Sequence, residues 1–339
     1  MSPDLVVAGG GPAGLATALH AAAAGLSVVV REPRAGVIDK ACGEGVMPAG
    51  VAHLAALGLR PEGREIVGIR YCSLGRSAAT RFRGAAGRGV RRTELHRTLR
   101  EAVLDAGIRM EHGRVRELRN QPGGVVVDGE AAGYVVVADG LHSPLRRVLG
   151  LEARTPGQAR YGLRRHVRLT PWTDHVEVHW AAQSEAYVTP VGEDEVGIAV
   201  LTTRRASYEE HLAEFPELLE RLAGAEPSSA VRGAGPLRQA SRRRVEGRTL
   251  LVGDAAGYVD ALTGEGISLA LAQAEAAVRH IVAGDPAGYE REWRRIVRRH
   301  RLLTQTLLTV AASPARPLLV PAAQRLPKVF AAAVNAVGG

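Results

Sequence analysis

The hydrophobic pattern of the first 32 residues predicts a strand, a helix and a second strand. An apolar run at residues 4–8 is followed by glycines, and residues 15–24 are then rich in Ala and Leu. A second apolar run covers residues 26–31. Short apolar runs that alternate with a helical segment are typical of β-α-β units with a parallel sheet. We therefore expect an α/β fold at the start of the chain.

Similar apolar runs return in separate pieces further along the chain. Leu95, Leu99 and Val103 recur every four residues, which is a helical period. The elements expected from these runs are helices at 92–106 and 267–281 and strands at 108–112, 124–127, 134–138 and 249–252. The α/β domain is thus expected to be discontinuous in sequence.

A second pattern, alternating apolar and polar residues, dominates residues 162–200. Its short runs are separated by turns, which favours an antiparallel sheet. Residues 67–73 and 78–82 flank a turn that contains Gly75 and predict a hairpin. Residues 208–223 predict one amphipathic helix, and the chain is expected to be helical from Tyr289 onward.

Three glycines join the first strand to the first helix in the spacing Gly9-X-Gly11-X-X-Gly14. The first glycine allows a tight turn, the second lets the backbone approach a pyrophosphate, and the third lets the helix pack on the strand. Glu32 ends the second strand, where an acid can bind a ribose 2′-hydroxyl. The segment therefore predicts a dinucleotide site.

The strand at 249–252 leads into Gly253-Asp254, and a second glycine turn, Gly264-Glu265-Gly266, opens the helix that follows. A carboxylate at the end of a buried strand can bind a polyol or ribose hydroxyl. Backbone N–H groups at a helix start suit an electron-rich or anionic ring. Together with the first glycine motif, this segment predicts bound FAD, held without a covalent bond.

Composition limits the other functions. The 339 residues are 46% hydrophobic and carry a net charge of +9, but only Lys40 and Lys328 are lysines. No basic patch is interleaved with aromatic residues, so we interpret the charge as compositional and expect no nucleic-acid partner. A positive surface remains suited to an acidic partner such as a carrier protein.

The two cysteines, Cys42 and Cys72, indicate neither a disulfide framework nor a zinc set, and we expect no metal. The first strand begins almost at once, which leaves no room for a signal peptide and favours a cytoplasmic protein. Residues 302–337 are apolar but interrupted by Pro and Arg. They favour a packed helical tail over a monotopic membrane contact.

The glycine motif, Asp139-Gly140-Leu141-His142-Ser143-Pro144 and Gly253-Asp254 occur in an order that resembles the flavoprotein hydroxylases of the p-hydroxybenzoate hydroxylase fold. The loop Lys40-Ala41-Cys42-Gly43-Glu44-Gly45 and the Thr263–Gly266 turn look closer to the geranylgeranyl reductase branch of that fold. One strand departs from that branch, because residues 185–192 keep only Tyr187 and Pro190 of its aromatic-rich motif.

The resemblance implies a role for each matching residue. Asp254 would bind the flavin ribityl or ribose oxygen, Arg92 the phosphate–ribityl region and Val115 the adenine through its backbone. Cys42 would lie beside the flavin and is the one candidate for catalysis; the alternative is a small residue buried in a tight loop. Asp139 would order the pyrophosphate region or cap the next helix. The candidate cofactor-binding residues are Gly9, Gly11, Pro12, Ala13, Gly14, Arg31, Glu32, Cys42, Gly43, Arg92, Val115, Asp139, Asp254, Gly264 and Gly266.

The fold expected is a Rossmann-like FAD-binding domain with an inserted antiparallel-sheet substrate domain and a C-terminal helical tail. We assign residues 1–66, 89–160 and 244–285 to the FAD-binding domain, 67–88 and 161–243 to the substrate domain, and 286–339 to the tail. The substrate, free or carrier-bound, is expected between the flavin and the antiparallel sheet. His166, His179 and Tyr187 are strand residues that either face it or face solvent.

Three functions remain open on these grounds. The first interpretation is an NAD(P)H-dependent monooxygenase acting on a small aromatic or apolar metabolite, because the chain lacks a second dinucleotide motif and would use NAD(P)H as a transient reductant. The second is a geranylgeranyl-reductase-like enzyme that saturates an alkene. The third is an FAD-binding protein without turnover.

Overall fold

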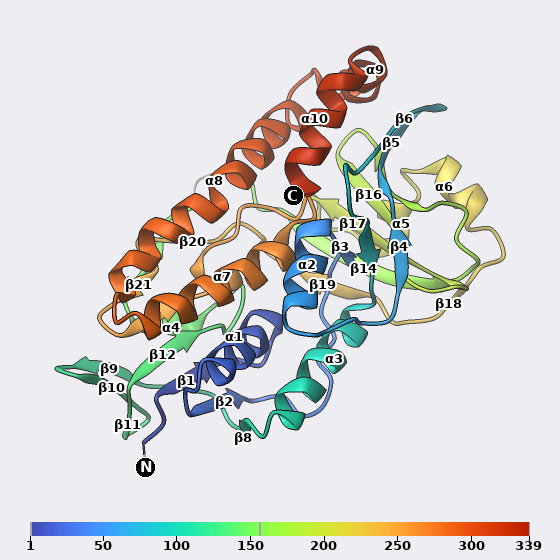
Figure 1. Cartoon of the computed structure of the whole chain (residues 1–339). Coiled ribbons are helices and arrows are strands. Elements are labelled where there is room, and N and C mark those ends of the chain that lie inside the picture. The colour runs from blue at the N-terminus through green and yellow to red at the C-terminus, as the bar shows by residue number, and fades with distance from the viewer. Residues whose placement is uncertain (1, 156, 339) are drawn as a thin grey trace.

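A six-stranded sheet forms the centre of the part of the molecule that contains the N-terminus (Figure 1). The computed structural model describes residues 2–155 and 157–338. In it the strands run in the order β21-β22-β12-β1-β2-β8, and all neighbouring pairs are parallel except β21–β22. The strands are β1 (Leu5–Ala8), β2 (Val28–Glu32), β8 (Arg109–His112), β12 (Tyr134–Val137), β21 (Val245–Glu246) and β22 (Thr249–Leu251).

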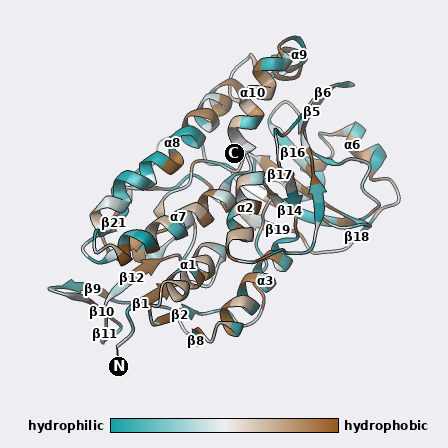
Figure 2. Cartoon of the chain, viewed as in Figure 1, coloured by the Kyte–Doolittle hydropathy of each residue, from teal (hydrophilic) through white to brown (hydrophobic). Residues whose placement is uncertain are grey.

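Helices α1 (Pro12–Ala23), α3 (Arg92–Asp105) and α7 (Gly266–Val282) pack together beside this sheet (Figure 1). Their apolar faces and the buried residues of β1, β12 and β22 form one core, and β1 is brown in Figure 2. Helix α1 begins at Pro12, three residues earlier than expected. Proline suits this first helical position, because its missing N–H would have no partner within the helix.

The antiparallel sheet predicted from residues 162–200 is the centre of an eight-stranded sheet. Strand β5 joins it by pairing in parallel with β15, which brings the hairpin at residues 68–81 beside strands far away in the sequence. The strand order is β18-β14-β17-β16-β15-β5-β6, with β19 also paired to β14. The strands are β5 (Gly68–Ser73), β6 (Arg76–Arg81), β14 (Tyr161–Arg168), β15 (His175–Trp180), β16 (Ser184–Pro190), β17 (Glu195–Thr202), β18 (Glu226–Pro227) and β19 (Arg232–Ala234).

Both faces of the large sheet are covered. Val188 and Ile198 pack on one face against Tyr208 and Leu218 of two short helices. The C-terminal tail covers part of the sheet at β5 and β15, where Phe330 packs with Tyr71 and Trp180. The tail comprises α8 (Pro286–Ala311), η2 (Arg316–Leu318), α9 (Leu319–Arg325) and α10 (Pro327–Gly338), and α8 lies along α7 (Figure 1).

The prediction of one helix over residues 208–223 is wrong. The segment forms two helices, α5 (Tyr208–Leu212) and α6 (Pro216–Arg221). Pro216 cannot continue a helix and disfavours helical backbone at the residue before it, and Phe215 is indeed non-helical. Pro216 instead starts the second helix.

The smaller elements connect these layers. They are β3 (Gly45–Val46), α2 (Pro48–Ala56), β4 (Arg64–Ile66), β7 (Gly87–Gly89), β9 (Leu118–Gln121), β10 (Gly124–Val127), β11 (Glu130–Ala132), α4 (Pro144–Val148), β13 (Glu152–Ala153), β20 (Ala240–Ser241) and η1 (Gly253–Ala256). The predicted fold class is confirmed. The exact domain boundaries stay a prediction.

Candidate functional site

The first glycine motif lies at the carboxyl end of β1, where the six-stranded sheet meets α1. Gly9 has a φ of +117°, and a side chain on it would collide with the carbonyl of Ala138. A side chain on Gly14 would collide with the carbonyl of Gly9. At Gly11, by contrast, no described residue beyond its chain neighbours has an atom within 4 Å of where a Cβ would be. Two glycines therefore permit the packing, and Gly11 leaves the backbone open to a ligand.

Glu32, at the end of β2, is fixed beside this motif. One carboxylate oxygen accepts the N–H of Gly10 at 2.7 Å, and the other accepts Arg34 Nε at 2.7 Å. Burial acts to raise the pKa of Glu32, but the hydrogen bonds from Arg34 and Gly10 outweigh it and hold the pKa below its usual range. The carboxylate is therefore charged and ready to accept further hydroxyl donors.

His96, on α3, supports the same loop and escaped the sequence analysis. Its Nε2 lies 2.8 Å from the carbonyl oxygen of Gly10, and its Nδ1 lies 3.2 Å from the backbone nitrogen of Ile38. Burial lowers the pKa of His96 to about 4. A neutral ring with the proton on Nε2 satisfies both contacts, because it donates to Gly10 and accepts from Ile38.

This arrangement predicts a pH-dependent contribution to stability. A histidine in the unfolded chain titrates near pH 6.5, so between about pH 6.5 and 4 the unfolded chain binds a proton that folded His96 does not. The contribution of His96 to the free energy of unfolding is fully present above pH 6.5. It falls by about 3 kcal/mol as the pH drops to 4. Urea unfolding of wild type and His96→Gln at several pH values should show this difference between them.

The exposed His112 supplies a matched control, because its side chain makes no comparable buried contact. His112→Gln should follow the wild-type pH dependence throughout. Stability curves for wild type and His96→Gln that stay parallel from pH 7 to 4 would contradict a buried neutral His96.

The second glycine motif touches the first. Gly253 has a φ of +60°, and a Cβ on it would lie 2.9 Å from the Cβ of Ala13. The N–H of Gly253 donates to Gln273 of α7 at 2.9 Å. Gly264 has a φ of +70°, and Gly266 is the first residue of α7. The starts of α1 and α7 are thereby brought to the same end of the sheet.

Asp254 is half-buried among positive charges. Burial raises the pKa of the Asp254 carboxyl, and the charges of Lys40, Arg92 and Arg146 offset part of that rise. Arg146 also donates to the backbone carbonyl of Asp254 at 3.3 Å, which fixes the turn. A hydroxyl donor from a ligand would favour the charged carboxylate here.

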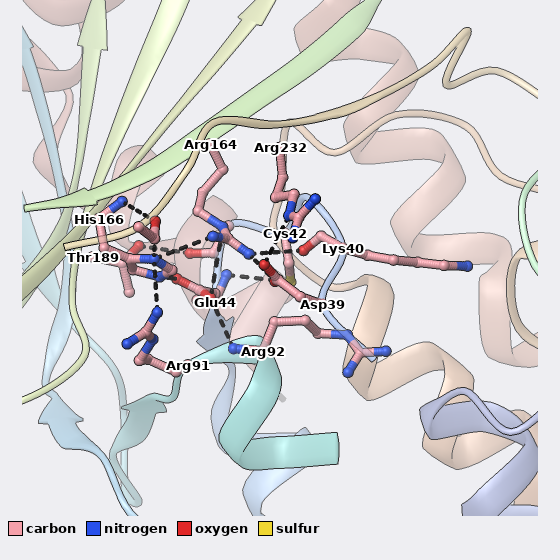
Figure 3. Close-up of polar contacts among 12 residues, drawn as sticks. Asp39, Lys40, Cys42, Glu44, Arg91, Arg92, Arg164, His166, Thr189 and Arg232 are labelled. Atoms are coloured by element: carbon pink, nitrogen blue, oxygen red, sulfur yellow. Dashed lines mark hydrogen bonds and ion pairs between the residues drawn. The ribbon is translucent and has the colours of Figure 1, made fainter. Parts of the chain in front are cut away.

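Arg92 begins α3 and points into this region. Its backbone N–H donates to Glu44 Oε1 at 2.8 Å, while its side chain extends away from Glu44, to the same side as Lys40 (Figure 3). The guanidinium is buried, and its Nη1 has no hydrogen-bond partner among the described residues. A buried cation without hydrogen-bond partners lowers the stability of the fold unless a ligand accepts its hydrogen bonds. An anionic or hydroxyl-rich cofactor would do so.

The Cys42 loop is held by a buried polar network that the sequence analysis did not predict (Figure 3). Glu44 is 1% exposed and has a φ of +61°, and its Oε2 lies 2.6 Å from His166 Nε2. Arg164 contacts His166 Nδ1 at 3.1 Å and pairs with Asp39. The network fastens the loop between α3 and β14.

Cys42 itself is a neutral thiol in this environment. Its Sγ accepts the N–H of Glu44 at 3.3 Å. Burial raises the pKa of the Cys42 thiol, and the negative charge of Glu44 raises it further. Since the thiolate is the nucleophilic form, the setting does not favour covalent catalysis by Cys42.

The remaining predicted residues lie around the same end of the sheet. Val115 is buried after β8, and Gly43 lies in the Cys42 loop, where its carbonyl accepts Thr189 Oγ1 at 2.7 Å. Asp139 follows β12 and accepts the N–H of Leu145, in the first turn of α4, at 3.1 Å, while Ser143 is the N-cap of that helix. Arg31 makes ion pairs with Glu111, Asp128 and Glu130.

The three strand residues named as substrate candidates have protein partners. His166 contacts Glu44, as described, and His179 contacts Glu177 at 3.1 Å. Tyr187 donates to the carbonyl of Leu262 at 2.9 Å, just before the second glycine turn. His300 of α8 holds that turn from the other side, through Glu265 Oε2 at 2.7 Å.

A cavity of about 1270 Å³ has Val259 and Asp260, which precede this turn in the sequence, in its lining. It extends from Val259 and Asp260 to the end of β15 and to residues 305–317 of the tail. Asp260 is fixed at one wall by Arg160 Nε at 3.0 Å. The cavity exceeds the roughly 300–1,000 Å³ of most small-molecule pockets.

The residues present fit FAD. The open backbone at Gly11, the charged Glu32, the unsatisfied Arg92 Nη1 and the start of α7 match a pyrophosphate, a ribose and a flavin ring. Within residues 2–155 and 157–338, no helix is both long enough and apolar enough to span a membrane.

Comparisons with known proteins agree with FAD binding by this chain. The sequence model of an FAD binding domain matches residues 3–284. The chain is 30% identical over 329 residues to menaquinone reductase from Mycolicibacterium smegmatis, covering 88% of this chain and 80% of that protein. It is 28% identical over 305 residues to digeranylgeranylglycerophospholipid reductase 2 from Methanosphaera stadtmanae, covering 79% and 75%.

Among solved structures, a flavoprotein/dehydrogenase from Cytophaga hutchinsonii superposes with a TM-score of 0.86 at 16% identity, covering 99% of this chain and 92% of the other. That likeness concerns the fold alone. The match over residues 3–284 and the 30% identical relative establish the family: the chain belongs to the FAD binding domain family and is an FAD-dependent oxidoreductase.

Proposed function

We propose that the enzyme saturates a C=C bond in a long polyprenyl chain, of the class that menaquinone carries. The observation that carries this proposal is the cavity of about 1270 Å³ that includes Val259 and Asp260, the residues that precede the turn to Gly264 and Gly266. A single phenol would fill only a small part of it, whereas a flexible isoprenoid chain can follow it from Asp260 toward the tail. The 30% identity to a menaquinone reductase supports the same substrate class.

The cofactor contacts follow from the geometry of the two motifs. We assign the pyrophosphate to the start of α1, at Gly9, Gly11, Pro12, Ala13 and Gly14. Glu32 would bind the adenosine ribose, Val115 would meet the adenine through its backbone, and Arg92 and Asp254 would hold the phosphate–ribityl region. Gly264 and Gly266 would place the positive end of α7 beside the flavin ring.

Bound FAD, once reduced by NAD(P)H, would supply the hydride, and the second hydrogen would arrive as a proton from solvent. The chain's own task is to seat the alkene, exclude water and keep the Cys42 loop rigid through Glu44 and His166. Cys42 would line the site as a neutral thiol. We assign NAD(P)H as the transient reductant, which does not require a second dinucleotide domain.

Product analysis tests the reaction type. Enzyme, NADPH and a polyprenyl quinone are expected to give, after any quinol has been reoxidised to the quinone, a product about 2 Da heavier, with and without air, since two hydrogens are added across one C=C bond. A product about 16 Da heavier, formed only in air, would instead favour the monooxygenase interpretation. Reduced enzyme that changes neither polyprenyl nor phenolic compounds would contradict both.

A variant of the cavity wall tests the substrate position. Ala312→Trp adds bulk at an exposed position lining the cavity, and Ala333→Trp adds the same bulk on the exposed face of α10. We expect Ala312→Trp to raise KM for a long polyprenyl substrate roughly tenfold, about 1.4 kcal/mol, without loss of FAD. Steady-state kinetics that are equal for the two variants would place the substrate elsewhere.

A further inference from the structure

A cluster of metal-ligand side chains lies on the large sheet, outside the glycine motifs. It consists of Cys72 on β5 and of Glu177 and His179 on β15. We propose that these three residues form a binding site for one zinc ion. The proposal does not depend on the substrate of the flavin reaction.

Strand pairing explains why the three side chains meet. Strands β5 and β15 are parallel neighbours, and their register places Cys72 directly beside His179. Glu177 precedes His179 by two residues, so both side chains are on the same face of the sheet. Since the ligands come from two distant segments, their spacing in the sequence gave no signal of a zinc set.

The distances between ligand atoms suit a metal ion. One ligand atom from each residue lies within 4.8 Å of the other two, and His179 Nε2 is 3.1 Å from Glu177 Oε2. Zinc ligands lie about 2.0–2.3 Å from the metal, so atoms sharing one tetrahedral ion are roughly 3–4 Å apart. A small adjustment of Cys72 would complete three corners of such a site.

The surroundings also favour zinc. All three residues are buried, and Glu177 is oriented by Trp172 Nε1 at 3.1 Å and by Arg70 Nε at 3.7 Å. Such outer partners fix the direction of a ligating carboxylate. A set of sulfur, nitrogen and oxygen ligands suits zinc better than magnesium or calcium.

The position suggests what the ion would do. Cys72 and His179 line the large cavity, which gives a water molecule access to a fourth coordination position. The ion would join the β5–β6 hairpin to β15 at the wall of that cavity. Ser77 and Ala186, the register neighbours of Cys72 and His179, are small and leave room for it.

Zinc titration of the FAD-loaded protein, against a chromophoric chelator and after removal of bound metals, tests the proposal. Wild type and Cys42→Ser should each bind one zinc ion tightly. Cys72→Ser and His179→Gln should lose more affinity than the roughly 10- to 100-fold that follows loss of an outer-shell partner. Trp172→Phe should fall within that smaller range.

X-ray absorption at the zinc edge should show one sulfur neighbour with nitrogen or oxygen neighbours in wild type and Cys42→Ser, and no sulfur in Cys72→Ser. Circular dichroism and FAD content identify variants that fail to fold. If Cys72→Ser and His179→Gln both fail to fold, the X-ray absorption spectrum of the wild type and the zinc affinity of Trp172→Phe test the proposal. Wild type that binds zinc no more tightly than Cys72→Ser, or a wild-type zinc shell without sulfur, would overturn the proposal.

Discussion

Gly11→Ala is expected to produce a folded protein that has lost FAD. Among the described residues beyond its chain neighbours, none has an atom within 4 Å of the new methyl group, so the packing of the apoprotein tolerates it. The methyl group would occupy the space through which the backbone approaches the pyrophosphate. We expect FAD affinity to fall at least about 100-fold, or about 2.7 kcal/mol, in a fluorescence titration of apoprotein.

Two other glycines define the controls for this experiment. Gly192→Ala lies in the turn after β16, where the added Cβ makes only ordinary contacts, and it should retain both fold and FAD. Gly14→Ala should instead fail to fold, because its Cβ collides with the Gly9 carbonyl. Gly11 is the N-cap of α1, so its replacement costs stability about 1 kcal/mol. Full FAD affinity in Gly11→Ala would place the pyrophosphate elsewhere.

Asp254→Asn has the second largest expected effect. The change keeps the shape of the side chain but removes a charge that lies among Lys40, Arg92 and Arg146. Loss of a charge-assisted hydrogen bond to a flavin hydroxyl should weaken FAD binding by about 1.5–3 kcal/mol, or roughly 10- to 150-fold. Titration of the apoprotein with FAD measures this directly.

The pH dependence of the same titration adds a second readout. Because burial raises the pKa of Asp254, FAD affinity of the wild type should fall as the pH is lowered toward that pKa. The affinity of Asp254→Asn should lack this component. Asp105→Asn, an exposed acid at the end of α3, is the matched control and should behave as wild type. Equal affinities for wild type and Asp254→Asn would remove Asp254 from the site.

The sequence predicted the parts of the site that depend on local chain geometry. Glycine spacing indicates tight turns and close approaches, so the turn at Gly9 and the helix packing at Gly14 could be predicted from the sequence. Glu32 followed from its place at the end of a strand. These features need only a few neighbouring residues to be recognised.

Contacts between distant segments were not predictable in the same way. Glu44 meets His166 across 122 positions in the sequence, and no periodicity links a glycine-flanked loop to a strand of another sheet. His96 was missed because a single histidine on an amphipathic helix gives no sign of which backbone groups it will meet. Pro216 is a local signal for the break between α5 and α6, although the apolar pattern continues across it.

The flavin content of the purified protein tests the central claim most directly. The two glycine motifs, Glu32 and Asp254 should hold one FAD per chain without a covalent bond. We expect a yellow protein that releases all of its flavin, identified as FAD, into the supernatant on acid precipitation. A colourless protein that takes up no FAD on titration, or flavin that remains attached to the denatured chain, would contradict the account.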